Sequence, residues 1–165
     1  PSKAKFMIRD CKNFEEYLTL ENIFLFSNWG VIPFWLLLLF SPNSSFTRFL
    51  VHSIIIPLML GIAYIFIAYQ IYLGDNLLDG FGLYLGLENL YAVFSDEKFL
   101  LIFWLHFLSI SLFTGAWIAR DSTRYSIPRS LTSLFLITTY FTGPLGIFLY
   151  WVIRIFFAKK ISLNE

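Results

Sequence analysis

The chain has 165 residues, of which 58% are hydrophobic and 21% aromatic, while only 14% are charged. Because a soluble domain is about one-quarter charged and at most half apolar, this composition disfavours an ordinary water-soluble enzyme or binding module. Twelve Lys and Arg against eleven Asp and Glu give a net charge of +1, so the chain offers no basic field for nucleic acid. The apolar excess predicts an integral membrane protein whose first partner is the lipid bilayer.

A polar segment, residues 1–21, precedes the first apolar run. It mixes basic and acidic side chains and lacks the continuous apolar core of a signal peptide. The single cysteine, Cys11, lies in this segment and has no partner for an internal disulfide. No spacing of Cys and His residues indicates a metal site.

Four apolar runs follow, each bounded by charged or turn residues: 22–40, 49–73, 99–118 and 131–157. A membrane-spanning helix needs about 20 mostly apolar residues, so each run is long enough to form one. The sequence therefore predicts an all-α fold, with one domain of four transmembrane helices over 22–157 and a short basic tail over 158–165. An even number of spans places both chain ends on one side, and the larger share of Lys and Arg on that side favours the cytosol or stroma.

The segment between the second and third runs, residues 74–98, is rich in carboxylates. Its apolar residues recur at helical spacing, at Leu83, Leu87, Leu90, Tyr91 and Phe94. This pattern is typical of a short helix that lies along the membrane interface. Three glycines weaken the helical interpretation, and a loop folded over the bundle is the alternative.

His106 falls inside the third run, where its imidazole is too deep to be freely hydrated, and polar groups at such depth usually face a partner or a cavity. At 100° per residue, one narrow arc of the helix carries His106, Ser109, Phe113, Trp117 and Arg120. We interpret this arc, together with the neighbouring Trp104, as a candidate surface for a long apolar ligand that carries oxygens. The alternative is a histidine that is hydrogen-bonded to another helix.

A second polar group is expected where the second run begins and the third run ends. His52 and Arg48 should lie on the same side of the membrane as Arg120, Asp121, Arg124 and Arg129. Together they form a candidate site for an anionic lipid headgroup or a substrate oxygen. A solvated surface with snorkelling side chains explains the same residues.

The fourth run contains the sequence Gly143-Pro144-Leu145-Gly146 near its middle. Because Pro144 has no N–H, the carbonyl of Tyr140 loses its helical partner, and we expect a kink at this point. Gly143 and Gly146 also lie on a small-residue stripe that lets another helix approach closely. Packing between helices is sufficient to explain this pattern.

Aromatic residues are abundant, with 20 Phe, nine Tyr and five Trp. Belts of aromatic side chains at the membrane interfaces account for many of them. An aromatic interior would also stack against a conjugated pigment, such as a carotenoid or chlorophyll. Composition alone does not separate these interpretations.

Several of these segments together resemble one family. The stretch from Gly86 to Phe94, the sequence Trp104-Leu105-His106-Phe107-Leu108 and the first run with its Pro33-Phe34-Trp35-Leu36 core are similar to the ABA4-like family of small four-span membrane proteins. The resemblance extends from about residue 24 to about residue 154. It also includes Leu112, Phe113, Gly115, Trp117, Arg120, Asp121, the sequence Gly143-Pro144-Leu145-Gly146 and Tyr150.

This resemblance implies a plastid or thylakoid membrane protein linked to neoxanthin formation, in which the epoxide of violaxanthin is opened and isomerised to an allene. Such a step needs an acid for the epoxide oxygen and a base for a polyene proton, and His106 and Asp121 are the candidate catalytic residues. This chain has Ser111 where the family commonly has Asp, which weakens the catalytic interpretation more than the binding one.

Two functional hypotheses follow from the sequence. The first is a protein of xanthophyll metabolism, with His106 central and with a carotenoid as its substrate or bound ligand. The second is a non-catalytic accessory subunit that packs against a large photosynthetic or other membrane complex and holds pigment.

Overall fold

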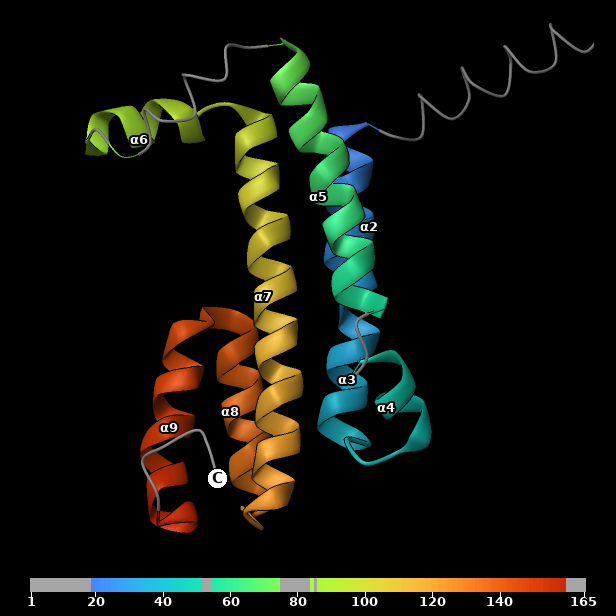
Figure 1. Ribbon diagram of the computed structural model, residues 1–165, viewed down its shortest axis with the longest axis vertical. Coiled ribbons are helices and arrows are strands. Elements are labelled where there is room, and N and C mark those ends of the chain that lie inside the picture. Colours follow the sequence, from blue (N-terminus) through green and yellow to red (C-terminus); the bar gives the residue numbers. More distant parts are fainter. Residues whose placement is uncertain (1–18, 52–54, 75–83, 85, 160–165) are drawn as a thin grey trace, which may run out of the picture.

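The computed structural model describes residues 19–51, 55–74, 84 and 86–159, and within these ranges every regular element is a helix (Figure 1). The predicted all-α fold is therefore confirmed. Two helical segments in the described part of the chain are long and apolar enough to cross a membrane, Leu20–Phe40 and Glu97–Arg124. The sequence predicted four such spans. Shorter apolar helices cover Leu58–Ile71 and Pro144–Ala158.

The first apolar run forms α2 (Leu20–Gly30) and α3 (Ile32–Phe40), which follow each other almost without a break. Thr19 caps α2 by accepting a hydrogen bond from the backbone N–H of Asn22. Pro33 occupies the first turn of α3, where its missing N–H costs nothing. The first predicted run, 22–40, is thus helical, and it is long and apolar enough to cross a membrane.

The second predicted span, 49–73, begins in one helix and continues in another. A short helix, α4 (Ser45–Leu50), is capped by Ser44, and the Thr47 hydroxyl donates a hydrogen bond of 2.6 Å to the carbonyl of Ser41. The longer helix α5 (Ile55–Gly74) follows. Residues 52–54 lie outside the described residues, and His52 is one of them.

The acidic segment after the second run contains α6 (Leu87–Phe94), which lies across the end of the bundle (Figure 1). The helical interpretation is therefore confirmed over 87–94, while Leu83 lies outside the described residues. The ring of Phe94 packs edge-on against Phe103 of α7, with 4.9 Å between the ring centroids. This contact holds α6 against the start of α7.

Helix α7 (Glu97–Arg124) is the central element and packs against α2, α3, α5, α6, α8 and α9. Asp96 caps it by accepting hydrogen bonds from the backbone N–H groups of Lys98 and Phe99. Gly115 allows α3 to approach α7 closely, because a Cβ atom at this position would lie 2.7 Å from the Trp35 ring. Trp35 is buried and brings α3 against the middle of α7.

The prediction of one kinked helix over 131–157 is wrong. The run forms α8 (Arg129–Thr142) and α9 (Pro144–Ala158), which reverse direction and pack side by side (Figure 1). Gly143 makes the turn with a φ of 58°, a conformation that favours glycine, and Pro144 starts the new helix. A positive φ followed by proline thus ends the helix completely, where proline alone would have bent it.

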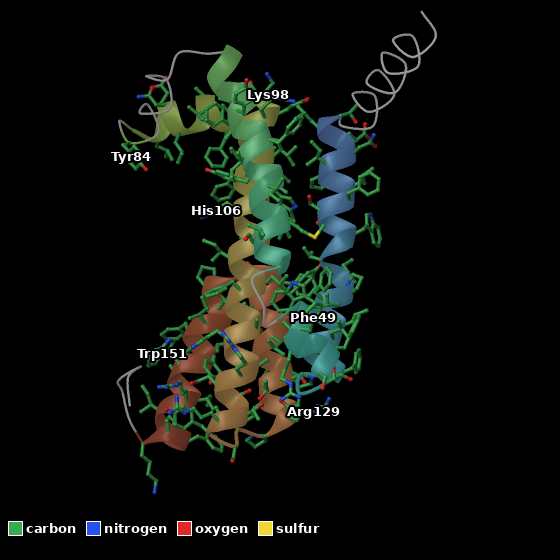
Figure 2. All side chains as sticks on the ribbon, turned by 45° about the vertical axis from the view of Figure 1, so that its right-hand side comes forward. Phe49, Tyr84, Lys98, His106, Arg129 and Trp151 are labelled. Atoms are coloured by element: carbon green, nitrogen blue, oxygen red, sulfur yellow. The ribbon has the colours of Figure 1, made fainter. Side chains whose placement is uncertain are left out.

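The α8–α9 hairpin changes where the chain ends lie. Leu20 at the start of α2 and Ala158 at the end of α9 are at opposite ends of the long axis (Figure 1), whereas the sequence predicted both chain ends on one side of the membrane. Arg154 and Lys159, at the end of α9, lie at the end of the molecule that holds the C-terminus of α7. Figure 2 shows Lys98 at one end and Arg129 at the other.

Candidate functional site

A buried ionic cluster joins α7 to α9. Asp121 on α7 accepts a hydrogen bond of 2.5 Å from the Tyr150 hydroxyl and another of 2.5 Å from Arg154 Nε, both on α9. Tyr150 and Arg154 have exposed fractions of 0% and 1%. The hairpin at Gly143 brings these residues together by folding α9 back along α7.

Aromatic rings surround the Arg154 guanidinium on two sides. Its Cζ atom lies 4.7 Å from the centre of the Tyr125 ring and 5.0 Å from that of Trp151. Its Nη2 atom donates a hydrogen bond of 3.3 Å to the Tyr125 hydroxyl. The Trp117 ring packs edge-on against Tyr150 at 5.4 Å. The charge of Arg154 is thus matched by one carboxylate and two aromatic faces.

This arrangement is well suited to holding two helices together and poorly suited to catalysis. Asp121 is fixed by two short hydrogen bonds, and its charge is paired with a buried guanidinium. A substrate cannot touch Tyr150 or Arg154 while both remain buried. Breaking such a pair is costly, because the remaining charge stays buried without a partner.

The predicted arc on α7 exists as a single face of that helix, but much of it points outward. His106 and Arg120 are exposed, and Phe113 has an exposed fraction of 61%. Ser109 and Trp117 are half-buried. The His106 ring lies 6.4 Å from the ring of Tyr64 on α5, and Figure 2 shows His106 at the side of the bundle.

The structure does not bring His106 and Asp121 together. Both residues lie on α7, and fifteen residues at 1.5 Å each separate them by about 22 Å along the helix axis. Two groups at this distance cannot act on the same reacting atoms. Ser111 lies between them on the buried side, and a Cβ atom on Gly143 would sit 3.6 Å from its hydroxyl oxygen.

A groove of about 570 Å³ lies between the start of α2 and the start of α7. Its walls are mainly apolar, and two carboxylates lie at its edge. The lining residues are Leu20, Glu21, Phe24, Glu97, Leu100, Leu101 and Trp104. The sequence predicted Trp104 as a ligand-binding residue, and the structure places it in this groove.

Trp104 has a buried indole nitrogen, Nε1, that finds no hydrogen-bond partner among the described residues. Its ring stacks on Phe107, with 5.4 Å between centroids and an interplanar angle of 26°, and lies 6.3 Å from the ring of Phe24. An unpaired buried donor costs about 1–3 kcal/mol. The groove therefore has an aromatic wall, and the unpaired indole N–H lies buried behind it.

The model of the ABA DEFICIENT 4-like family matches residues 22–150 of this sequence. The chain belongs to the ABA4-like family. No curated protein and no solved structure matches it. The matched range includes α2 to α8, the turn at Gly143 and the first part of α9 as far as Tyr150.

Several residues that carried the resemblance have clear structural roles in this ABA4-like chain. Gly115 makes room for Trp35, and Gly143 with Pro144 forms the hairpin turn. Gly146 packs so closely on α8 that an added Cβ atom would collide with Thr139. The resemblance therefore includes positions that determine the packing of α3, α7, α8 and α9.

The sequence did not predict that Arg154 contacts Asp121. A continuous fourth span places Arg154 on the opposite side of the membrane from Asp121, so a contact between them was excluded. The signal that was available is the Gly-Pro dipeptide, which is a strong indicator of a turn. Tyr125 was missed as well, because nothing in the sequence showed that a guanidinium would lie over its ring.

Proposed function

We propose that this ABA4-like chain binds a xanthophyll in a photosynthetic membrane and acts in the formation of neoxanthin. The observation that carries the proposal is the groove between α2 and α7. A xanthophyll end ring is apolar and carries one or two oxygens, and ligand sites typically combine apolar walls with a few polar groups. The groove offers the carboxyl groups of Glu21 and Glu97 as acceptors, and Trp104 forms part of its aromatic wall.

The conjugated chain of the ligand would continue along α7. The stacked rings of Trp104 and Phe107 extend from the groove toward the middle of that helix. Aromatic side chains favour offset contacts with other π systems, so a polyene is a suitable occupant of this surface. His106 and Phe113, which are exposed further along α7, would then face the polyene or the surrounding lipid.

The groove also contains the groups that an epoxide isomerisation requires. In this reaction an acid donates a proton to the epoxide oxygen as the C–O bond breaks, and a base removes a proton from the polyene. The electron pair of that C–H bond forms the new double bond of the allene, so atoms and charge balance. Glu21 and Glu97 are therefore better placed for this pair of roles than His106 and Asp121, because both line one cavity.

Pigment binding by Trp104 variants tests this proposal. Expressed in a carotenoid-producing host that lacks its own neoxanthin factor, the wild-type protein should retain a xanthophyll through purification. We expect Trp104→Ala to lose about nine-tenths of that pigment, because it removes the aromatic wall of the groove. The matched control is Trp29→Ala, since Trp29 lies on the same helix as Phe24 but is 67% exposed.

Equal pigment contents in the two tryptophan variants would contradict the groove as the binding site.

The isomerase role has a separate readout, which is neoxanthin in the host extract. Glu21→Gln combined with Glu97→Gln should abolish neoxanthin while leaving bound pigment largely unchanged. Neoxanthin formation by this double variant at the wild-type level would contradict the acid–base assignment.

A second candidate function, that of an accessory subunit, is favoured by the outer face of α5. This face carries large exposed apolar side chains at helical spacing: Leu58, Met59, Ile62, Ile65 and Tyr69. A neighbouring membrane subunit could cover this face in place of lipid. Stoichiometric co-migration with a large pigment complex in mild detergent would support this function, whereas a small free particle would contradict it.

A further inference from the structure

A second cavity, of about 470 Å³, lies at the end of the molecule opposite α6. Its walls come from the loop between α3 and α4, the C-terminal turns of α7 and the first turns of α8. Half of the lining residues carry a hydroxyl group, among them Ser44, Ser122 and Ser126. Two contacts close the cavity at its edge, one from Thr123 Oγ1 to Asn43 Oδ1 at 3.4 Å and one from Arg129 to the carbonyl of Phe40.

The charge of this cavity is positive. Arg129 lines it, and no Asp or Glu belongs to its lining within the described part of the chain. Arg48 on α4 and Arg120 on α7 lie at the same end of the molecule and are exposed. The hydroxyls of Ser122 and Thr123 donate to the carbonyl of Ala119. An oxyanion entering the cavity would therefore meet the Arg129 guanidinium and the Ser126 hydroxyl, with no carboxylate in the lining to repel it.

The cavity also lies at the depth where lipid headgroups are found. Phe40 is the last residue of the segment Leu20–Phe40, one of the two helical segments long enough to cross a membrane, and it lines the cavity. Thr123 lies in the last turn of the other segment, Glu97–Arg124. Both segments thus bring the cavity to the boundary between hydrocarbon and headgroups.

We propose that this cavity binds the anionic headgroup of a membrane lipid, with Arg129 as the charged partner. The chemistry that it recognises is a phosphate- or sulfonate-type oxyanion. The acyl chains would lie against the apolar outer surface of the bundle, below the cavity rim. The assignment to a lipid, over free phosphate, follows from the position of the cavity at the ends of two spans.

Two substitutions at Ser126, to Asp and to Asn, test whether charge governs binding. The two new side chains differ in charge but hardly in shape. Ser126 lines the cavity and has a φ of 55°, which both Asp and Asn tolerate. Native mass spectrometry of the purified protein in detergent measures binding of phosphatidylglycerol. We expect Ser126→Asp to weaken binding about tenfold, and Ser126→Asn to retain the wild-type affinity.

Arg129 provides an independent variant in case Ser126→Asp does not fold. Arg129→Gln should also weaken binding about tenfold, whereas Arg120→Gln, an exposed arginine outside the cavity lining, should change it less than twofold. Circular dichroism and size-exclusion chromatography verify that each variant is folded.

Three results would overturn the proposal. The first is equal binding of phosphatidylcholine and phosphatidylglycerol by the wild-type protein. The second is equal losses for Arg129→Gln and Arg120→Gln, which would indicate general electrostatic attraction. The third is thermal stabilisation by inorganic phosphate alone that matches the effect of the lipid, which would assign the cavity to the free ion.

Discussion

Arg154 is the one charged residue among the described residues whose side chain is fully buried. Its pairing with Asp121 explains how a guanidinium is tolerated there, because the carboxylate accepts a hydrogen bond from Nε and the Tyr125 hydroxyl accepts one from Nη2. Two aromatic faces supply further compensation. The pair thus makes the packing of α9 on α7 depend on specific partners.

Removing one partner of this pair should be much more harmful than removing both. We expect Arg154→Met to lower the free energy of unfolding by about 3–5 kcal/mol, because Asp121 is left as an uncompensated buried charge. Combining it with Asp121→Leu should restore part of that loss. Denaturant titration in detergent micelles measures both effects. Arg120→Met is the control, since Arg120 is exposed, and a loss of similar size there would contradict the explanation.

At the residue scale, the sequence was informative about residue types and uninformative about partners. Asp121 was predicted to belong to a polar cluster and to be a candidate catalytic residue, and the structure pairs it with Tyr150 and Arg154. His106 was the other candidate catalytic residue, and the structure places it on an exposed face. Helical periodicity identifies which residues share a face, but it does not identify what that face contacts.

At the scale of the elements, the α8–α9 hairpin is stabilised by one close contact. A Cβ atom added to Gly146 would lie 2.1 Å from the hydroxyl oxygen of Thr139 and 2.4 Å from its backbone nitrogen. Because backbone atoms cannot move aside cheaply, any side chain at this position must separate α8 from α9. The small-residue stripe predicted for close helix packing is therefore used inside one hairpin.

We expect Gly146→Val to lower the midpoint of thermal unfolding by several degrees, because it forces the two helices apart. The matched control is Gly61→Ala in α5, where an added Cβ atom meets nothing within 4 Å. That substitution should be neutral or stabilise the helix by up to about 1 kcal/mol. A thermal scan in the same detergent measures both variants, and equal midpoints would contradict the role assigned to Gly146.

Most helices were predictable from the sequence, while the reversal of the chain at Gly143 was not. The runs over 22–40 and 99–118 are helical because they are long, apolar and bounded by capping residues such as Thr19 and Asp96. The run over 131–157 satisfies the same test of hydropathy. It forms two helices because Gly143 has a positive φ of 58°. A hydropathy profile contains no information about backbone angles.

At the scale of the whole molecule, the described charges are segregated between its two ends. The end with α6 is mainly acidic, with Glu21, Glu88, Asp96, Glu97 and Lys98. The end with the C-terminus of α7 is mainly basic, with Arg48, Arg120, Asp121, Arg124, Arg129, Arg154 and Lys159. Basic ends of membrane proteins face the cytosol or the equivalent compartment. The proposed lipid cavity lies at this basic end.

Cysteine labelling tests the resulting topology. In a Cys11→Ser background, Glu21→Cys and Lys159→Cys should react with a membrane-impermeant maleimide from opposite sides of sealed vesicles. Lys159→Cys should share its side with Ser126→Cys, because the hairpin returns the chain to the end where α7 stops (Figure 1). Four complete spans would instead place positions 21 and 159 on the same side, and labelling from one side would contradict the hairpin.

The turn at Gly143 also has a consequence for biogenesis. A continuous fourth span would require the translocation machinery to carry Arg154 and Lys159 through the hydrocarbon layer, at a cost of several kcal/mol for each charge. A hairpin inserted from the side where α7 emerges would bring only its uncharged tip into the bilayer. The newly made C-terminal segment can therefore join its carboxylate partner on α7 without any charge having crossed.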